Sequence, residues 1–237
     1  MTAKKGSGTL ALVGGGEWQE PCRALDESLL KAAKADEVLV LPAAAAFEYP
    51  ERVVERAAAW FESLGAKVKA LHVLNRRDAE RDETVKAVES CRFLYIADGS
   101  PLHLRSVLKS SACFDAIAKA HSNGATIAAS GAGATLLGDP MVDPRGGAYT
   151  VGLGLARGLA VFPYHGTAAD HLRERSVELL PADAVLVGVD EHTALVRTGD
   201  QPWRVVGPGN VTIYRRGADA AVHGDGDQLS EMVTLKM

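Results

Sequence analysis

The sequence predicts an α/β fold with a mainly parallel central sheet and helices on both of its faces, in three layers. Short apolar runs alternate with amphipathic segments along the first half of the 237-residue chain. Strands that alternate with helices in this way are joined by right-handed crossovers, which make the strands parallel. The predicted strands are nearly continuous apolar runs, as expected where helices cover both faces of a sheet.

Five strands and the helices between them are expected in the first 130 residues. The predicted strands are short apolar runs bounded by turn or polar residues, and they cover 9–15, 37–43, 66–73, 92–97 and 125–130. The predicted helices have apolar residues at helical spacing, and they cover 22–35, 50–65, 79–91 and 101–124. The last range has room for two helices, and 50–65 has proline at its start and glycine at its end, the usual order at helix termini.

The second half has a different pattern, with shorter apolar segments separated by turn residues. This pattern predicts strands over 158–165, 184–198, 203–216 and 232–237. We expect them to extend the same sheet with antiparallel or mixed strands. No linker separates the halves, so residues 1–237 are expected to form a single domain. Only 1–7 and 217–228 have the composition of flexible segments.

The composition and charge of the chain limit the classes of protein to which it can belong. The chain is 47% hydrophobic and 24% charged, with a net charge of −4, so a sizeable core is expected and a nucleic-acid partner is not. The longest uncharged apolar run is too short for a membrane span, and the N-terminal apolar stretch runs into a triple glycine without a secretory cleavage site. Three widely spaced cysteines predict reduced, structural thiols in a cytoplasmic protein.

Ligands of parallel α/β sheets bind beyond the carboxyl ends of the strands. Four turns fall at such ends, at 14–18, 43–50, 98–101 and 130–134. The triple glycine of the first turn could hold a phosphate, but it matches neither nucleotide-binding fingerprint, and Glu17 would repel an anion. A tight turn is the simpler interpretation, and we expect no cofactor.

The turn at 130–134 is more specific. A nucleophile elbow requires small residues around a strained position between strand and helix, and a helix N-terminus there favours a developing oxyanion. The sequence ASGAGA has these small residues, but Gly131 at its sharpest point has no side chain. The residues alone leave open both a catalytic turn and simple packing.

Five segments together resemble the peptidase E and cyanophycinase family of serine hydrolases, which have a class I glutamine amidotransferase-like fold. They are LVGGGE, YIADGSPLHLRSVL, ASGAGA, GLGLARGLAVFPYH and VGVDEHTAL, in the order that the family has. The resemblance covers most of the chain. It implies hydrolysis of a peptide or small amide by acyl transfer.

The resemblance assigns roles to particular residues. It places the catalytic base at His165 and the acid that orients it at Glu191, the usual partners of a hydroxyl nucleophile. Backbone N–H groups of Gly99 and Ala132 would hold the oxyanion. Asp190 or His192 could replace Glu191, and His165 could instead be a structural histidine at a strand end.

The nucleophile departs from the family pattern. The family serine falls on Gly131, and Ser130 falls on the residue before it. Adjacent residues of a strand point to opposite faces, so Ser130 would reach His165 only after a one-residue change of register.

Other positions also depart from the pattern. Asp98-Gly99-Ser100 stands where the family has Gly-Gly-Asp, and Arg173 and Arg175 only partly match an arginine-rich segment, which argues against an aspartyl-arginine substrate. A metal-binding helix would have a second histidine or cysteine four residues after His171. Arg175 occupies that position instead, so no metal is expected. His103 is expected on a helix surface.

Two functions remain. The first is a serine-type peptidase or amide hydrolase, impaired by Gly131 and with Ser130 as a substitute nucleophile. The second is a pseudoenzyme that keeps the fold and binds a peptide, small amide or protein partner. The sequence is also compatible with an engineered Gly131. An exposed strand edge in the second half is compatible with a homodimer, and no membrane partner is expected.

Overall fold

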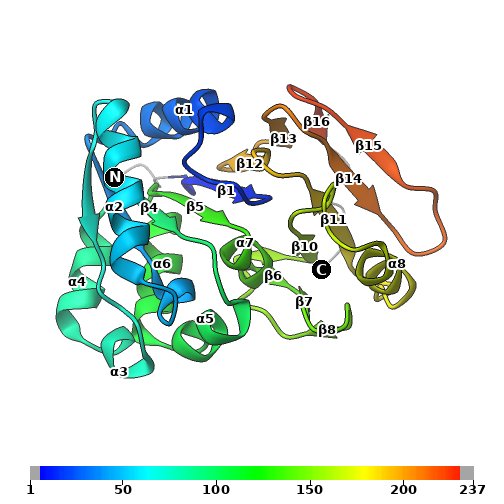
Figure 1. Cartoon of the computed structure of the whole chain (residues 1–237), viewed down its shortest axis with the longest axis horizontal. Helices are drawn as coiled ribbons and strands as arrows, with labels where there is room; N and C mark the ends of the chain where they lie inside the picture. The colour runs from blue at the N-terminus through cyan, green and yellow to red at the C-terminus, as the bar shows by residue number, and fades with distance from the viewer. Residues whose placement is uncertain (1–5, 230–237) are drawn as a thin grey trace.

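The computed structural model describes residues 6–229 and has the predicted α/β fold with a mainly parallel central sheet (Figure 1). Eight strands form this sheet, in the order β16-β13-β12-β1-β5-β4-β2-β3. Its parallel strands are β1 (Thr9–Val13), β2 (Glu37–Leu41), β3 (Lys67–Ala70), β4 (Phe93–Ile96) and β5 (Thr126–Ser130). Its antiparallel strands are β12 (Ala194–Thr198), β13 (Trp203–Val206) and β16 (Gln228–Leu229).

Helices cover both faces of the sheet. One face packs against α1 (Arg23–Ala33) and α2 (Pro50–Ser63). The other packs against α4 (Asp82–Ser90), α5 (Pro101–Leu108) and α6 (Ala112–Ser122). Alternate residues of β1 supply the two cores, since Leu10 and Leu12 face one layer and Ala11 and Val13 the other. The remaining helical segments are η1 (Glu20–Cys22), η2 (Ala43–Ala45), α3 (Arg76–Ala79), α7 (Ala132–Leu137) and α8 (Asp170–Glu178).

The C-terminal half corrects one prediction, because only part of it extends the central sheet. A second sheet has the order β10-β11-β14-β15 and lies with α8 to the right in Figure 1. Its strands are β10 (Leu159–Phe162), β11 (Val185–Val189), β14 (Val211–Tyr214) and β15 (Ala221–His223). The predicted strand 184–198 is therefore two strands in two sheets, and 203–216 divides in the same way.

The turn at 190–193 causes the first division. His192 takes a left-handed conformation there, with φ 59°. The turn packs on Gly14, where a Cβ atom would lie less than 3.0 Å from the carbonyl oxygens of Val189 and Asp190. Gly14 therefore permits the close approach of two chain segments.

Short elements complete the described chain. Two parallel strands, β6 and β9, and two antiparallel strands, β7 and β8, form small separate sheets. They cover Gly138–Asp139, Ala156–Arg157, Met141–Val142 and Tyr149–Thr150, respectively. The segment 217–228, expected to be flexible, contains β15, whereas the strand predicted at 232–237 lies outside the described residues. No helix between residues 6 and 229 is long and apolar enough to cross a membrane.

Candidate functional site

The candidate site lies at the sharp turn from β5 into α7. Gly131 forms the turn with φ 48° and ψ −105°, a conformation that strains any residue with a side chain. β5 lies between β1 and β4 in the centre of the sheet. The turn therefore projects from the carboxyl edge of the parallel strands, where ligands of such sheets bind.

Asp98, which follows β4, fills the space beside Gly131. A Cβ atom on Gly131 would lie less than 3.0 Å from the carboxylate carbon and both carboxylate oxygens of Asp98. The Oδ1 atom of Asp98 accepts hydrogen bonds from the N–H groups of Gly99 and Ala132, both at 2.7 Å. These are the two groups that the family resemblance assigns to an oxyanion, and here both bind a carboxylate of the chain itself.

Ser130 is turned toward a buried glutamate. Its side chain is 0% exposed, and its Oγ donates to Oε2 of Glu17 at 2.8 Å. The other oxygen of Glu17 accepts from Nη2 of Arg56 and from the N–H of Asp98, both at 3.4 Å. Ser130 is thus held in the interior by the Glu17 carboxylate, and none of its hydrogen bonds involves His165.

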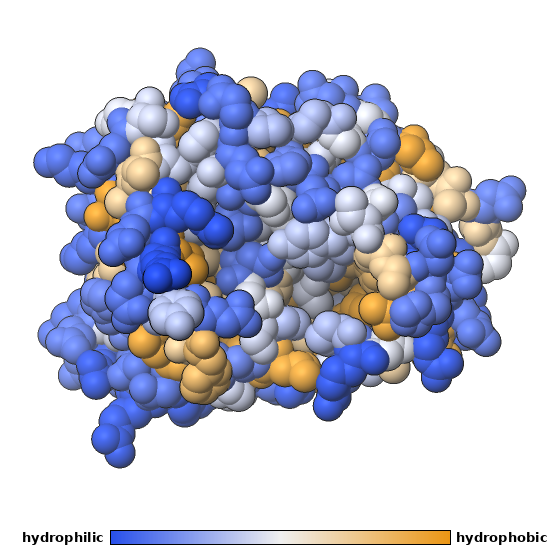
Figure 2. Space-filling model, viewed as in Figure 1, coloured by the Kyte–Doolittle hydropathy of each residue, from blue (hydrophilic) through white to orange (hydrophobic). Residues whose placement is uncertain are grey.

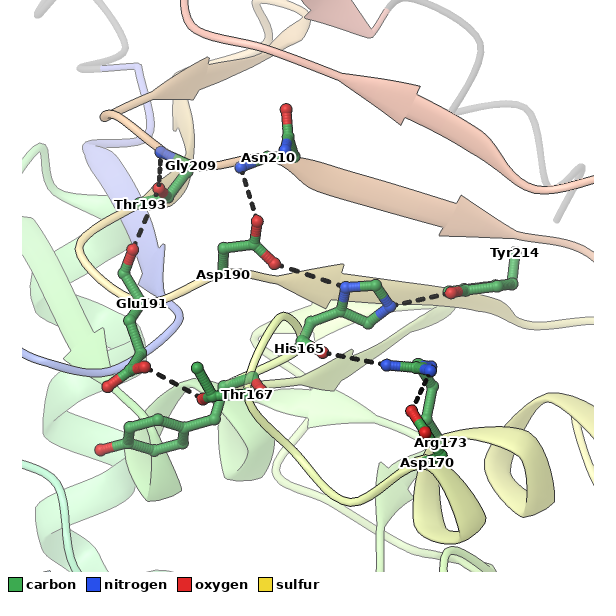
Figure 3. A network of polar contacts seen from close by, with 11 residues as sticks. His165, Thr167, Asp170, Arg173, Asp190, Glu191, Thr193, Gly209, Asn210 and Tyr214 are labelled. Atoms are coloured by element: carbon green, nitrogen blue, oxygen red, sulfur yellow. Dashed lines mark hydrogen bonds and ion pairs between the residues drawn. The ribbon is translucent and has the colours of Figure 1, made fainter.

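His165 makes its contacts with the second sheet. Figure 3 shows its imidazole between Asp190 and Tyr214. The Nδ1 atom lies 3.4 Å from Oδ1 of Asp190, and Nε2 lies 2.8 Å from the Tyr214 hydroxyl. Burial lowers the pKa of His165, and the negative charge of Asp190 opposes this shift. The residue beside the imidazole is therefore Asp190, one of the alternatives to Glu191.

Glu191 has a different partner. Its Oε2 atom accepts a hydrogen bond from the Thr167 hydroxyl at 3.0 Å (Figure 3). The structure thus assigns the two neighbouring acids to different partners, Asp190 to His165 and Glu191 to Thr167.

Tyr164, rather than His165, approaches the turn at Gly131. Its hydroxyl donates to Oδ2 of Asp98. Tyr164 has φ 53°, and its ring lies over Gly15, where a Cβ atom would lie less than 3.0 Å from the ring carbons. Burial, followed by the hydrogen bond to Asp98, raises the pKa of Tyr164 far above its usual range. The hydroxyl therefore stays protonated and remains a donor to the carboxylate.

The Asp98–Tyr164 contact lies between two pockets and lines both. One pocket is mainly apolar and reaches α8. The other is lined by three glutamates and one arginine, namely Glu17, Glu48, Glu191 and Arg56. In the sequence, position 98 stands out only as a departure from a family turn, and nothing distinguishes Tyr164 apart from its place next to His165. Within residues 6–229, no group of three or more His, Cys, Asp or Glu side chains is placed to hold a metal ion.

A mainly parallel sheet, with a sharp strand-to-helix turn at its centre and two N–H groups facing one oxygen, has the framework of an α/β peptidase. The chain belongs to Peptidase family S51, which matches residues 10–204. The resemblance to the peptidase E and cyanophycinase family is thereby confirmed.

Individual relatives agree with this assignment. A cyanophycinase of Nostoc sp. (strain PCC 7120) is 28% identical over 215 residues, 85% of this chain and 72% of the relative. A cyanophycinase of Geminocystis herdmanii is 25% identical over 218 residues, covering 86% and 79%.

Solved structures agree as well. The crystal structure of a peptidase from an acI-B1 Actinobacterium has a TM-score of 0.85 and 27% identity, covering 96% of this chain and 98% of that one. A putative peptidase E protein from Listeria monocytogenes EGD-e has a TM-score of 0.66 at 17% identity, covering 88% and 98%, and supports the fold alone.

Proposed function

We propose that this chain is a pseudoenzyme of its family, which has lost serine-type acyl transfer and uses the site to bind a peptide or small amide. The observation that carries the proposal is the Asp98 carboxylate, which fills the nucleophile position and accepts both N–H groups of the oxyanion site. Removal of a triad nucleophile lowers kcat by about 10⁶, and the activity left depends largely on the oxyanion hole. Here that hole already holds an anion.

The contacts of Ser130 support the same conclusion. A hydroxyl becomes a nucleophile when an imidazole accepts its proton within hydrogen-bonding distance. Ser130 instead donates to buried Glu17, while His165 lies between Asp190 and Tyr214. Ser130 and His165 therefore have different hydrogen-bond partners, on different elements of the fold.

Tyr164 stands where a base would have to be. Its hydroxyl reaches the group that replaces the nucleophile, and it lines the same compartment as Glu191. A tyrosine with a raised pKa is protonated at neutral pH and does not accept a proton. We therefore propose that no base faces the turn, since the aligned histidine, His165, contacts Asp190 and Tyr214 instead.

The fit between Asp98 and Gly131 favours an inherited arrangement over a single engineered substitution. A serine-to-glycine change alone would leave a vacant space at the turn. Here the space is filled by the carboxylate of Asp98, which follows the neighbouring strand β4, at a position where the family has glycine. Two complementary changes that satisfy each other's hydrogen bonds support a site built for another purpose.

Reaction with a fluorophosphonate probe tests the proposal. We expect no covalent labelling of the wild-type protein under conditions that label an active serine peptidase. Ser130→Ala is the matched control. Labelling of the wild type that disappears in Ser130→Ala would show that Ser130 is a working nucleophile and would overturn the proposal.

A further inference from the structure

The mainly apolar pocket beside Asp98 has a composition that selects a particular chemistry. It lies between α7 and α8, and its wall includes Pro101, Val142, Phe162, Pro163 and Leu172. Asp98 and Tyr164 form its polar end, where it adjoins the second pocket that they also line. On the face shown in Figure 2, hydrophilic residues cover most of the surface, and hydrophobic residues gather near α5 and toward α8. The pocket thus combines hydrocarbon walls with one polar end.

The polar end is negatively charged. None of the residues that line the pocket is a lysine, arginine or histidine. Asp143 also lines it, but the guanidinium of Arg145 pairs with this carboxylate and lowers its pKa. The salt bridges of residues 6–229 do not include Asp98. Asp98 is therefore held by neutral donors, and its charge is available to a ligand.

Asp98 also has hydrogen-bonding capacity left. A carboxylate has about four acceptor sites. Two on Oδ1 are taken by N–H groups and one on Oδ2 by the Tyr164 hydroxyl. One site on Oδ2 remains for a donor, and the nearby carboxylate of Glu17, whose oxygen accepts from the Asp98 N–H, increases the preference for a positive charge.

We propose that this pocket binds a primary ammonium group attached to an apolar side chain, as at the N-terminus of a peptide that begins with an apolar residue. The ammonium would donate to Oδ2 of Asp98, and the side chain would pack against Phe162 and Leu172. An ionic partner in a partly desolvated site is strongly favoured over a neutral one. A ligand carboxylate is excluded by repulsion. This inference rests on the proposed binding function and names the ligand class for it.

Calorimetric titration with L-leucinamide tests the ligand class. The comparison ligands are N-acetyl-L-leucinamide, which keeps the side chain but has no charge, and N-acetyl-L-leucine, which is an anion. We expect leucinamide to bind and both acetylated compounds to bind at least about tenfold more weakly, the effect of removing one partner of a desolvated charge pair. Equal affinity for the charged and uncharged amides would overturn the proposal, as would the absence of leucinamide binding at millimolar concentration.

Three variants locate the binding. Asp98→Asn keeps an oxygen that accepts from Gly99 and Ala132 but removes the charge, so leucinamide affinity should fall at least about tenfold. Asp225→Asn makes the same change in a carboxylate that also accepts a backbone N–H but lines neither pocket, and should leave the affinity unchanged. Ala168→Leu fills the pocket without a change of charge, and should also weaken binding.

The outcomes separate the two proposals. Unchanged leucinamide affinity in Asp98→Asn and Ala168→Leu would overturn the ligand assignment. If Asp98→Asn does not fold, Ala168→Leu and the comparison of the three ligands still test whether the pocket binds an apolar ammonium compound. Fluorophosphonate labelling reports independently on the loss of acyl transfer, so an unreactive protein that does not bind leucinamide would contradict only the ligand class.

Discussion

Asp98 and Gly131 occupy one space at the turn between β5 and α7. A side chain at position 131 would overlap the carboxylate of Asp98. The site can therefore hold a carboxylate at 98 with glycine at 131, or a side chain at 131 with a small residue at 98, but not both side chains. Glycine at 131 and the acid at 98 are in this sense one structural feature.

The first prediction is that Gly131→Ser is destabilising unless Asp98 is also replaced. The new Cβ would meet the carboxylate, and the positive φ adds strain, so we expect a loss of about 2–4 kcal/mol in the free energy of unfolding. Asp98→Gly/Gly131→Ser should recover most of this loss, because the overlap is gone. Urea denaturation of the two single variants and the double variant gives the coupling energy. A Gly131→Ser protein as stable as the wild type would contradict the overlap.

The second prediction is that a base at position 164 is needed to restore reactivity. The variant Asp98→Gly/Gly131→Ser has a hydroxyl and free N–H donors, but Tyr164 does not accept its proton. Adding Tyr164→His should give fluorophosphonate labelling that exceeds that of the double variant. His165→Ala in the triple variant is the control, and should leave labelling unchanged. If instead labelling depends on His165, then His165 is the base.

The third prediction is that Asp98→Gly creates a site for small carboxylates. The change leaves the N–H groups of Gly99 and Ala132 and the Tyr164 hydroxyl without their acceptor. Acetate or formate should therefore raise the melting temperature of the variant with its concentration, as binding to the native state requires. Sodium chloride at the same ionic strength controls for general salt effects. Equal stabilisation of the wild type by acetate would argue against a site at this position.

The five parallel strands and their helices could be predicted because local spacing encodes them. The division of 184–198 could not, since both halves are apolar and the turn at 190–193 has no glycine or proline. His192 supplies the left-handed residue there, and the four polar residues of the turn do not show which of them takes that conformation. The sheet that each strand joins depends on contacts with Gly14, far away in the sequence.

The site was only partly predictable for a similar reason. The departures at 98 and 131 are both visible in the sequence, but their complementarity depends on the pairing of β4 with β5. The orientation of Tyr164 toward the turn, with His165 beside Asp190, depends on φ 53° at Tyr164. A single left-handed residue at a strand end changes which of two neighbours faces the turn, and no side-chain pattern reports it.

The fourth prediction is that Asp190, and not Glu191, sets the titration of His165. The Asp190 charge raises the pKa of His165 against the larger effect of burial. Asp190→Asn should therefore lower the pKa of His165 further, whereas Glu191→Gln should leave it unchanged. Imidazole chemical shifts followed by NMR as a function of pH measure both. A lower pKa in Glu191→Gln would assign Glu191 to His165 after all.

The fifth prediction concerns Asp26 on α1, which is 0% exposed. Its Oδ2 accepts from Nε1 of Trp60 at 2.8 Å, and Oδ1 has no hydrogen-bond partner within the described chain. Burial raises the pKa of Asp26 to about 7. The native state thus keeps a proton that the unfolded state releases near pH 4, and stability falls as the pH rises from about 4 to 7.

Asp26→Asn removes this cost, because the amide is neutral at every pH and its oxygen still accepts from Trp60. We expect the variant to match the wild type near pH 4 and to exceed it by about 2–4 kcal/mol at pH 8. Urea denaturation at the two pH values measures the difference, with the exposed Asp36→Asn as the control. A gain at pH 4 equal to that at pH 8 would mean that the amide improves packing rather than removing a buried charge.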